Sequence, residues 1–197
     1  ESTDISIRTN ERRTFSDIDS VASWAQEAIE NLAGMGIVKG VSGSKYKPND
    51  TISKAEFTAM VIRTFGLDTA PVGYLTDVKP GKWYYREIMI AENFGVIQPD
   101  ASGRFYPEAA ITREEIAVIL LRALEAAEKE FTGHSNEKLE KFRDRNLISP
   151  YAMASMAMLV GEGIMEGFPD NTIGPKSTAT RAQAAVFLHR TMNKYLL

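Results

Sequence analysis

Residues 110–122 read AITREEIAVILLR, and two similar stretches occur at 52–63, ISKAEFTAMVIR, and at 179–190, ATRAQAAVFLHR. Apolar residues in the first stretch recur at helical spacing, which predicts an amphipathic helix. In each copy a Ser or Thr is followed three residues later by Glu or Gln. This is the capping-box pattern, and it predicts that a helix begins there. The three pairs are Ser53–Glu56, Thr112–Glu115 and Thr180–Gln183.

These stretches belong to longer internal repeats. An offset of 59 residues carries Gly36 to Gly95 and Ile52 to Ile111, and a further offset of 68 residues carries Gly95 to Gly163. Each repeat begins with an aromatic or apolar residue shortly before an acid, seen as FSD, LTD and FRD. A first helix, a loop rich in Gly, Pro and Asp, and a second helix follow. We predict an extension at 1–14, repeats at 15–70 and 71–131, a polar joint at 132–141, and a third repeat at 142–197.

The first helices are predicted over 24–37, 83–97 and 151–165. In the first of them a glycine, Gly36, supplies the stop. One face of that helix carries Trp24, Ala28, Ile29, Leu32 and Met35. A single pair of short helices cannot bury its apolar face, so neighbouring repeats have to cover it. We therefore expect an all-α fold with three helix-loop-helix repeats packed around a pseudo-threefold axis, and a groove at each junction between repeats.

Composition excludes several classes of protein. The chain has 197 residues and a net charge of only −3, so it lacks the strong positive field of a typical nucleic-acid binder. Cysteine is absent, which excludes disulfides and thiolate metal sites. No apolar run approaches the roughly 18 residues needed to cross a bilayer, so we predict no membrane insertion. The chain starts at Glu1 rather than at methionine, as expected of a processed or excised product, and a targeting signal would not be visible.

A basic residue directly follows each cap, at Lys54, Arg113 and Arg181. A cation in the first turn opposes the helix dipole by some tenths of a kcal/mol, so capping does not explain it. Beside free backbone N–H groups, such a cation would form a site for a carboxylate or phosphate. The alternative is a salt bridge to an acid of the same or a neighbouring repeat, such as Asp17, Asp77 or Asp144, and the two interpretations are compatible.

The repeated pattern resembles the S-layer homology (SLH) domain. The residues that carry the resemblance are the F-x-D motif, the W-A-x-x-A-I stretch, a loop that ends in proline, and the helix starts SKAE, TREE and TRAQ. Such domains usually come in threes in bacterial surface proteins, and here the match covers residues 15 to 197. The resemblance implies a secreted protein at the cell surface, in the cell wall or S-layer. It implies non-covalent anchoring to a secondary cell-wall polysaccharide attached to peptidoglycan, through a pyruvylated N-acetylmannosamine unit. Other parts of a longer surface-layer protein are further expected partners.

The resemblance also implies a set of ligand-binding residues. A carboxylate-bearing sugar needs cations, hydroxyl acceptors, an aromatic face for stacking, and backbone that it can approach closely. The alternatives are core packing for the aromatics and helix caps or turns for the glycines. The ligand-binding residues expected are Asp17, Trp24, Gly40, Lys54, Asp77, Trp83, Arg113, Asp144, Tyr151, Gly167 and Arg181.

Departures from the family pattern predict unequal grooves. Lys54 replaces arginine and loses its bidentate fork. Pro99 stands where the other loops have glycine, and Glu114 where the other repeats have alanine. An acid beside Arg113 would weaken its attraction for an anion. We therefore expect the groove served by Arg181 to bind best and the groove served by Arg113 to bind least, with all three cations replaceable without loss of the fold.

Other functions have weaker support. The two histidines, His134 and His189, lack a nucleophile or acid at a recognisable spacing, so we predict no catalytic residues and no enzyme, although paired carboxylates for glycan cleavage are not excluded by sequence. The loops are too long for helix-turn-helix DNA recognition. The loop acids lack EF-hand spacing, so no metal site and no cofactor are predicted. The main alternative function is a helical protein–protein interaction module of a surface protein, which would expose an apolar patch rather than a polar groove.

Overall fold

Six α-helices and four short 3-10 helices make up the regular structure of a computed structural model that describes residues 15–131 and 136–197. The predicted extension, part of the polar joint and His134 lie outside these residues. The α-helices are α1 (Ser23–Gly34), α2 (Lys54–Phe65), α3 (Tyr85–Asn93), α4 (Arg113–Ala126), α5 (Met153–Gly161) and α6 (Arg181–Tyr195). The 3-10 helices are η1 (Ile18–Ser20), η2 (Asn136–Leu139), η3 (Arg145–Leu147) and η4 (Pro150–Ala152). The described residues form only isolated β-bridges and no strand, so the all-α prediction is confirmed.

The helices begin and end for the local reasons that the sequence indicates. Complete capping boxes open α2, α4 and α6 at Ser53, Thr112 and Thr180, as predicted. The first helices are shorter than predicted, and each is followed two residues after its end by a glycine with positive φ, at 74°, 70° and 71°. Only glycine adopts this conformation at little cost, so these positions redirect the chain into the loop.

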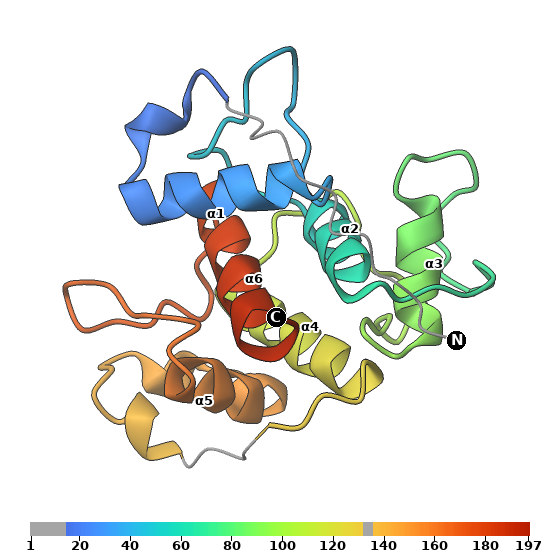
Figure 1. Cartoon of the computed structure of the whole chain (residues 1–197). Coiled ribbons are helices and arrows are strands. Elements are labelled where there is room, and N and C mark those ends of the chain that lie inside the picture. The colour runs from blue at the N-terminus through green and yellow to red at the C-terminus, as the bar shows by residue number, and fades with distance from the viewer. Residues whose placement is uncertain (1–14, 132–135) are drawn as a thin grey trace, which may run out of the picture.

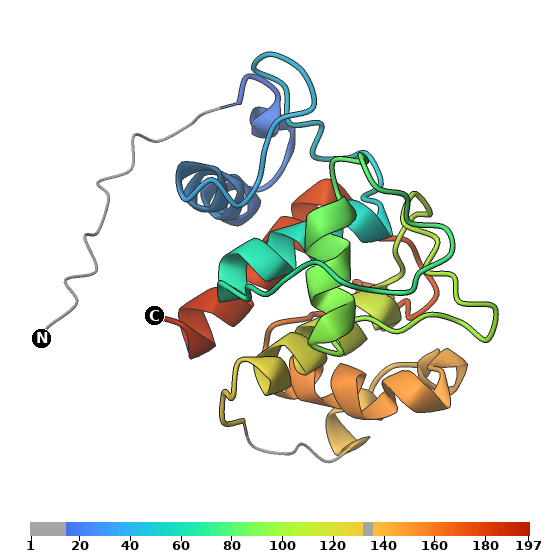
Figure 2. The ribbon, with the colours of Figure 1, turned by 90° about the vertical axis from the view of Figure 1, so that its right-hand side faces the viewer.

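The first helix of each repeat packs against the second helix of another repeat. α1 contacts α6, α3 contacts α2, and α5 contacts α4, while α2, α4 and α6 also contact one another. Figures 1 and 2 show α1, α3 and α5 at the periphery around the other three helices. Each first helix therefore covers a neighbouring repeat, in the same cyclic order throughout. An exact pseudo-threefold axis stays a prediction.

Three backbone hydrogen bonds join the segments that precede the second helices into a closed ring. Ile52 N donates to Ala179 O at 3.1 Å, Ala179 N to Ile111 O at 3.0 Å, and Ile111 N to Ile52 O at 3.0 Å. All three side chains are fully buried. Because each bond joins two different repeats, the ring holds all three helix starts together at the centre of the molecule.

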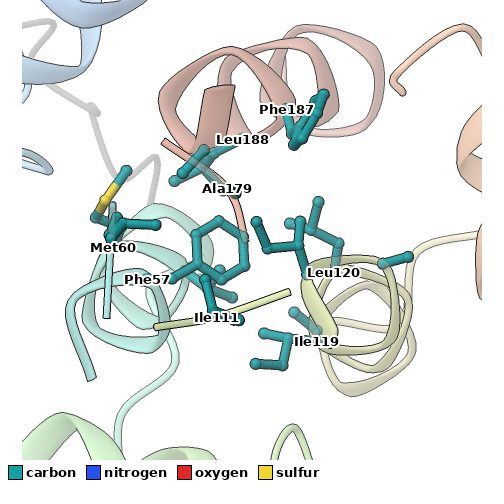
Figure 3. Close-up of a cluster of buried hydrophobic side chains, with 14 of the residues drawn as sticks. Phe57, Met60, Ile111, Ile119, Leu120, Ala179, Phe187 and Leu188 are labelled. Atoms are coloured by element: carbon teal, nitrogen blue, oxygen red, sulfur yellow. The ribbon is translucent and has the colours of Figure 1, made fainter. Parts of the chain in front are cut away.

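The main core lies between the three second helices. In Figure 3, Phe57 of α2, Leu120 of α4 and Leu188 of α6 gather around Ile111 and Ala179 of the ring. Burying side chains of this size contributes about 1.5–3 kcal/mol each. Two residues assigned above to the apolar face of the first helix do not join the core, because Trp24 and Met35 are 55% and 49% exposed. Among the described residues, no helix is both long enough and apolar enough to cross a membrane.

Candidate functional site

Each basic residue at the start of a second helix reaches into another repeat. Arg181 donates from Nε to the Tyr46 carbonyl oxygen at 2.9 Å and from Nη2 to that of Lys39 at 3.1 Å, and its Nη1 lies 2.5 Å from a carboxylate oxygen of Glu56. The guanidinium also stacks over the Tyr46 ring at 4.8 Å. Arg181 is only 7% exposed, so it acts as a buried link between repeats three and one.

The other two cations also reach into the next repeat, Lys54 from repeat one into repeat two and Arg113 from repeat two into repeat three. Lys54 lies 2.5 Å from a carboxylate oxygen of Glu115. Arg113 donates from Nε to Ile173 O at 2.8 Å and from Nη2 to Glu166 O at 2.6 Å. The salt bridges expected as one interpretation of these cations therefore exist at Lys54 and Arg181. Their acids, however, belong to the capping boxes of neighbouring repeats, rather than to the F-x-D motifs.

Arg113 is enclosed by aromatic rings. Its guanidinium carbon lies 4.7 Å from the Phe168 ring centroid and 5.2 Å from that of Phe187, and the residue is 2% exposed. The residue of repeat three that corresponds to Glu56 and Glu115 is Gln183, so the Arg113 guanidinium has no capping-box carboxylate to pair with. Burial lowers the pKa of Arg113 to about 10, while the charge of Asp144 acts in the opposite direction. Arg113 still carries its charge at neutral pH.

The backbone N–H groups at these helix starts are already bound. The N–H groups of Lys54 and Ala55 donate to the carbonyl oxygens of Ala109 and Pro107, at 2.9 and 2.8 Å, and the third N–H of α2 donates to the Ser53 hydroxyl. The corresponding groups of α4 and α6 are bound in the same way. The prediction of free N–H donors beside each cation is therefore wrong, because a neighbouring repeat supplies their acceptors.

The three acids of the F-x-D motifs bind loop backbone. Each carboxylate accepts two N–H bonds, one at each oxygen, across the loop of its own repeat. Asp17 accepts from Tyr46 and Lys47, Asp77 from Phe105 and Tyr106, and Asp144 from Ile173 and Gly174, all at 2.7–3.0 Å. Burial alone would raise the pKa of Asp17, but these N–H bonds outweigh it and lower the pKa. The acids fix the loops, and a role in binding ligand stays a prediction.

The two loop glycines, Gly40 and Gly167, are each in close contact with the aromatic ring of the F-x-D motif in their own repeat. A Cβ at Gly40 would lie 2.7 Å from the Lys45 carbonyl oxygen and 2.9 Å from the Phe15 ring. A Cβ at Gly167 would lie 2.7 Å from the Thr172 carbonyl oxygen and would overlap the Phe142 ring. Both positions therefore require glycine for packing within the loop.

Two grooves open at junctions between repeats. Groove A, with a cavity volume of about 590 Å³, lies between repeats one and two, and repeat three contributes its helix-start cation, Arg181. It is lined by Ile37, Val38, Lys39, Gly40, Val41, Glu56, Met60, Arg63, Trp83, Glu87 and Arg181. Groove B, with a cavity volume of about 520 Å³, lies between repeats two and three, and repeat one contributes its helix-start cation, Lys54. It is lined by Lys54, Ile97, Gln98, Pro99, Asp100, Arg104, Phe105, Tyr106, Ile111, Glu115, Val118, Ile119, Arg122 and Tyr151.

An exposed aromatic residue stands on the wall of each groove. Trp83 in groove A is 59% exposed, and Tyr151 in groove B is 61% exposed. Core packing therefore does not account for these two aromatics. Groove B has a second aromatic wall residue, Tyr106, which adopts a left-handed backbone with φ 59° and donates its hydroxyl to Asp100 at 2.9 Å.

The two grooves differ in how a second arginine is paired. In groove A the guanidinium of Arg63 lies 2.5 Å from a carboxylate oxygen of Glu87. In groove B the corresponding Arg122 donates to the neutral amide oxygen of Gln98 at 3.1 Å. Within the described part of the chain, Arg122 has no acid as an ion-pair partner. The sequence prediction missed these arginines as groove residues, although the repeat offset already carried Arg63 to Arg122 and Arg190.

At the third junction, between repeats three and one, the side chains that correspond to the groove residues contact one another. The Arg190 guanidinium lies over the Trp24 ring at 5.7 Å, and Phe168 and Phe187 enclose Arg113 as described above. Of the predicted site residues, groove A therefore contains Gly40, Trp83 and Arg181, and groove B contains Lys54 and Tyr151. The remaining six line neither groove: Asp17, Trp24, Asp77, Arg113, Asp144 and Gly167.

The reasons given for the groove ranking were wrong. Pro99 lies in groove B with Lys54, rather than in a groove with Arg113. The acid that pairs with Arg181 comes from another repeat, so the absence of an acid in its own first turn leaves it no freer. Arg113 is not paired with either following acid, since Glu114 pairs with Lys176 and Glu115 with Lys54. Sequence neighbours therefore did not identify the spatial neighbours.

Comparison with known proteins identifies the family. The model of the S-layer homology domain matches residues 14–58, 74–117 and 141–185, which is more than half of the chain. The chain belongs to the S-layer homology domain family. These matches cover the loops and second-helix starts that form grooves A and B.

Several relatives contain a similar SLH region. The chain is 37% identical over 185 residues to an amylopullulanase of Thermoanaerobacterium thermosulfurigenes, covering 92% of this chain and 10% of that protein. It is 29% identical over 189 residues to the S-layer protein sap of Bacillus anthracis, covering 93% and 22%. It is 25% identical over 177 residues to a cellulosome-anchoring protein of Acetivibrio thermocellus, covering 85% and 39%. The chain thus spans between about a tenth and two fifths of the length of these relatives. SLH domains are anchoring rather than catalytic domains, and this family membership supports cell-wall anchoring.

Proposed function

We propose that this chain is a non-covalent cell-wall anchoring module that binds a secondary cell-wall polysaccharide in grooves A and B. The finer proposal is that the bound unit is a pyruvylated N-acetylmannosamine. On this proposal the chain is part of a secreted protein, and the polysaccharide attached to peptidoglycan is its partner.

The first support comes from what the relatives share. Proteins named amylopullulanase, S-layer protein and cellulosome-anchoring protein have different activities, yet each contains a region similar to about nine tenths of this chain. A region common to such different proteins serves a purpose independent of the chemistry of any one of them. Attachment to the cell surface is such a purpose, and it gives this region no catalytic role.

The observation that carries the proposal is the composition of the two grooves. Each combines apolar residues, several charged groups and one strongly exposed aromatic residue, contributed by three different repeats. An aromatic face can stack on the apolar face of a sugar ring, and surrounding polar groups can bind its hydroxyls. A flat apolar docking surface, which a protein–protein interaction module would need, lacks this combination.

Groove B is the better candidate for the acidic unit. An incoming carboxylate in groove A would compete with Glu87 for Arg63, whereas in groove B it could displace the neutral Gln98 amide from Arg122. Charge-assisted hydrogen bonds between a guanidinium and a carboxylate are roughly twice as strong as neutral ones. We therefore propose that Arg122, together with the ion pair of Lys54 and Glu115, contacts the acidic substituent.

The test is co-sedimentation with purified cell walls. We expect binding to walls that carry the polysaccharide, reduced binding after mild acid removal of pyruvate ketals, and no binding to stripped peptidoglycan. Added salt should weaken binding only modestly, because the charged contacts lie within a groove rather than on an open surface. Equal binding to stripped and unstripped walls would refute the proposal. Binding only to other wall proteins would favour the protein–protein alternative.

A further inference from the structure

A buried carboxylate at the start of α4 distinguishes one junction from the other two. Glu114 is 2% exposed and occupies the second position of this helix. The corresponding residues of α2 and α6 are Ala55 and Ala182. A buried acid destabilises the fold unless hydrogen bonds compensate it, so its presence at only one of three equivalent positions needs an explanation.

Four donors from repeat three compensate this carboxylate. Ser149 donates its hydroxyl at 2.9 Å and its backbone N–H at 3.1 Å, Lys176 Nζ lies at 2.6 Å, and the Tyr151 hydroxyl donates at 3.0 Å. Burial alone would raise the pKa of Glu114, but these bonds outweigh it and lower the pKa. Burial and the bond to Glu114 raise the pKa of Tyr151 to about 12. At neutral pH, Glu114 is therefore an acceptor and Tyr151 a donor.

The exposed aromatic residue at this junction also differs from those at the other two junctions. Tyr151, Trp83 and Trp24 occupy corresponding positions in their repeats, and the first helices at these positions pack on α4, α2 and α6 in cyclic order. The two tryptophans are at the junctions where the second helix carries alanine. The one tyrosine is at the junction with glutamate, and its hydroxyl bonds to that acid. Glu114 and Tyr151 thus form a pair that replaces the alanine–tryptophan combination.

We propose that Glu114 is a positioning residue for ligand binding in groove B, where it holds the exposed ring of Tyr151 in place before a sugar stacks on it. This inference rests on the proposed function. A ring that is 61% exposed and held by its hydroxyl loses less conformational freedom on binding than a free ring does, which improves affinity. Glu114 itself lines neither groove, so its effect on the ligand passes through Tyr151.

The test is a mutant cycle measured by calorimetric titration of the whole chain with a synthetic methyl glycoside of pyruvylated N-acetylmannosamine. A Trp83→Ala background removes the stacking residue of groove A. In this background we expect Tyr151→Phe to weaken binding about three- to tenfold, as for loss of one hydrogen bond. Glu114→Gln should weaken it about threefold, because the amide oxygen still accepts from the Tyr151 hydroxyl but without the charge that strengthens the bond. The double variant Glu114→Ala/Tyr151→Trp restores the combination found at the other junctions, and it should recover most of the affinity.

A purely structural role for Glu114 predicts different results. If Glu114 acts through Tyr151, then adding Glu114→Gln to Tyr151→Ala should cause no further loss of affinity. A further loss of the same size as that measured with Tyr151 intact would overturn the proposal, as would unchanged affinity in Glu114→Gln when Tyr151→Ala weakens binding. Thermal unfolding of every variant shows which of them remain folded at the titration temperature.

A second measurement separates this inference from the proposed function. Alkaline titration of tyrosine absorbance needs no ligand, and the difference between wild type and Tyr151→Phe isolates the hydroxyl of Tyr151. We expect this hydroxyl to ionise near pH 12 in the wild type and at a lower pH in Glu114→Gln, where burial still raises the pKa but the charge of Glu114 no longer does. If the glycoside does not bind but this shift is present, the proposed ligand fails while the Glu114–Tyr151 pair stands. If the shift is absent, the positioning role fails whatever the ligand.

Discussion

At the scale of single residues, the capping-box acids have two roles. One carboxylate oxygen of Glu56 accepts from the Ser53 N–H at 2.9 Å, and the other lies 2.5 Å from the Arg181 guanidinium. Glu115 divides its oxygens in the same way between Thr112 and Lys54. A basic residue at a helix start is thus explained by the acid and carbonyl groups of another repeat, which outweigh the opposing helix dipole.

Arg181→Ala should destabilise the fold. The substitution leaves a half-buried Glu56 and two carbonyl oxygens without their donor, and breaking a buried ion pair costs about 3–5 kcal/mol. We expect urea unfolding to show a loss in this range. This replaces the sequence-based expectation that the variant keeps its melting temperature. Arg86→Ala removes an exposed pair with Asp68 and is the control, with a loss below about 1 kcal/mol. Equal losses for the two variants would contradict the buried link.

Trp83→Ala should reduce wall binding and leave stability almost unchanged. The indole is 59% exposed on the wall of groove A, so it contributes little to the core and is available to a ligand. Co-sedimentation and thermal unfolding of the same sample measure both effects. Tyr74→Ala is the matched control, because Tyr74 is 94% exposed and lines neither groove. Unchanged wall binding by Trp83→Ala would remove groove A from the proposed site.

At the scale of elements, the loop between the two helices of a repeat is an ordered structure. In every repeat the acid of the F-x-D motif binds two loop N–H groups, and in repeats one and three the aromatic residue of the same motif packs on a loop glycine. Asp144, Phe142 and Gly167 supply this arrangement in repeat three. The loops can therefore shape grooves without being covered by other elements.

Gly167→Ala should destabilise repeat three. The added methyl would lie 2.7 Å from the Thr172 carbonyl oxygen and overlap the Phe142 ring, and overpacking of this kind typically costs 1–3 kcal/mol. Denaturant unfolding measures the loss. Ser42→Ala, at an exposed position in the loop of repeat one, is the control for a loop substitution without a clash. A melting temperature equal to that of the wild type would show that the loop can shift at no cost.

At the scale of the whole molecule, the repeats are interlocked rather than stacked in a row. The closed ring of Ile52, Ile111 and Ala179 requires all three repeats. α1 packs on α6, so the first and last α-helices of the chain cover each other. A row of repeats with only nearest-neighbour contacts can lose its last unit and stay folded, whereas a closed arrangement cannot.

A chain cut after residue 131 should therefore fail to fold. It would lack α6, which covers α1, and one third of the hydrogen-bonded ring. We expect little helical circular dichroism from it. The whole chain should unfold in a single transition that far-ultraviolet circular dichroism and tryptophan fluorescence report at the same temperature. Independent melting of repeats in the whole chain would contradict this.

Stability should fall in acid. The pKa values of Glu114 and Asp17 are lowered from their ordinary values of 4.5 and 3.8, so the folded state binds their protons less tightly than the unfolded state does. Their contribution is fully present above about pH 4.5 and is lost as the pH falls through the lowered values. Urea unfolding between pH 7 and pH 3 measures this. Glu114→Gln should flatten the decrease, and an unchanged slope would contradict the assignment.

Much of the local structure was predictable, because it depends on residues close together in sequence. The capping boxes at Ser53, Thr112 and Thr180 were correct, since a cap needs only the first turn of a helix. The sequence left open whether Trp24 packs in the core or is exposed to a ligand, because an apolar residue at helical spacing is indistinguishable from a core residue until the neighbouring elements are placed. The groove pairing of Arg63 with Glu87 was missed for the same reason.

The sequence by itself determined the repeats, the all-α class, the helix starts and the family resemblance, all of which follow from spacing and local hydrogen bonding. Only the tertiary structure decided which repeats meet. It joined Arg181 to Glu56, placed Lys54 and Tyr151 in one groove, and bound the helix-start N–H groups that were expected to be free. The physical reason is that three similar repeats offer equivalent partners in sequence, and packing around a common core selects among them by distance.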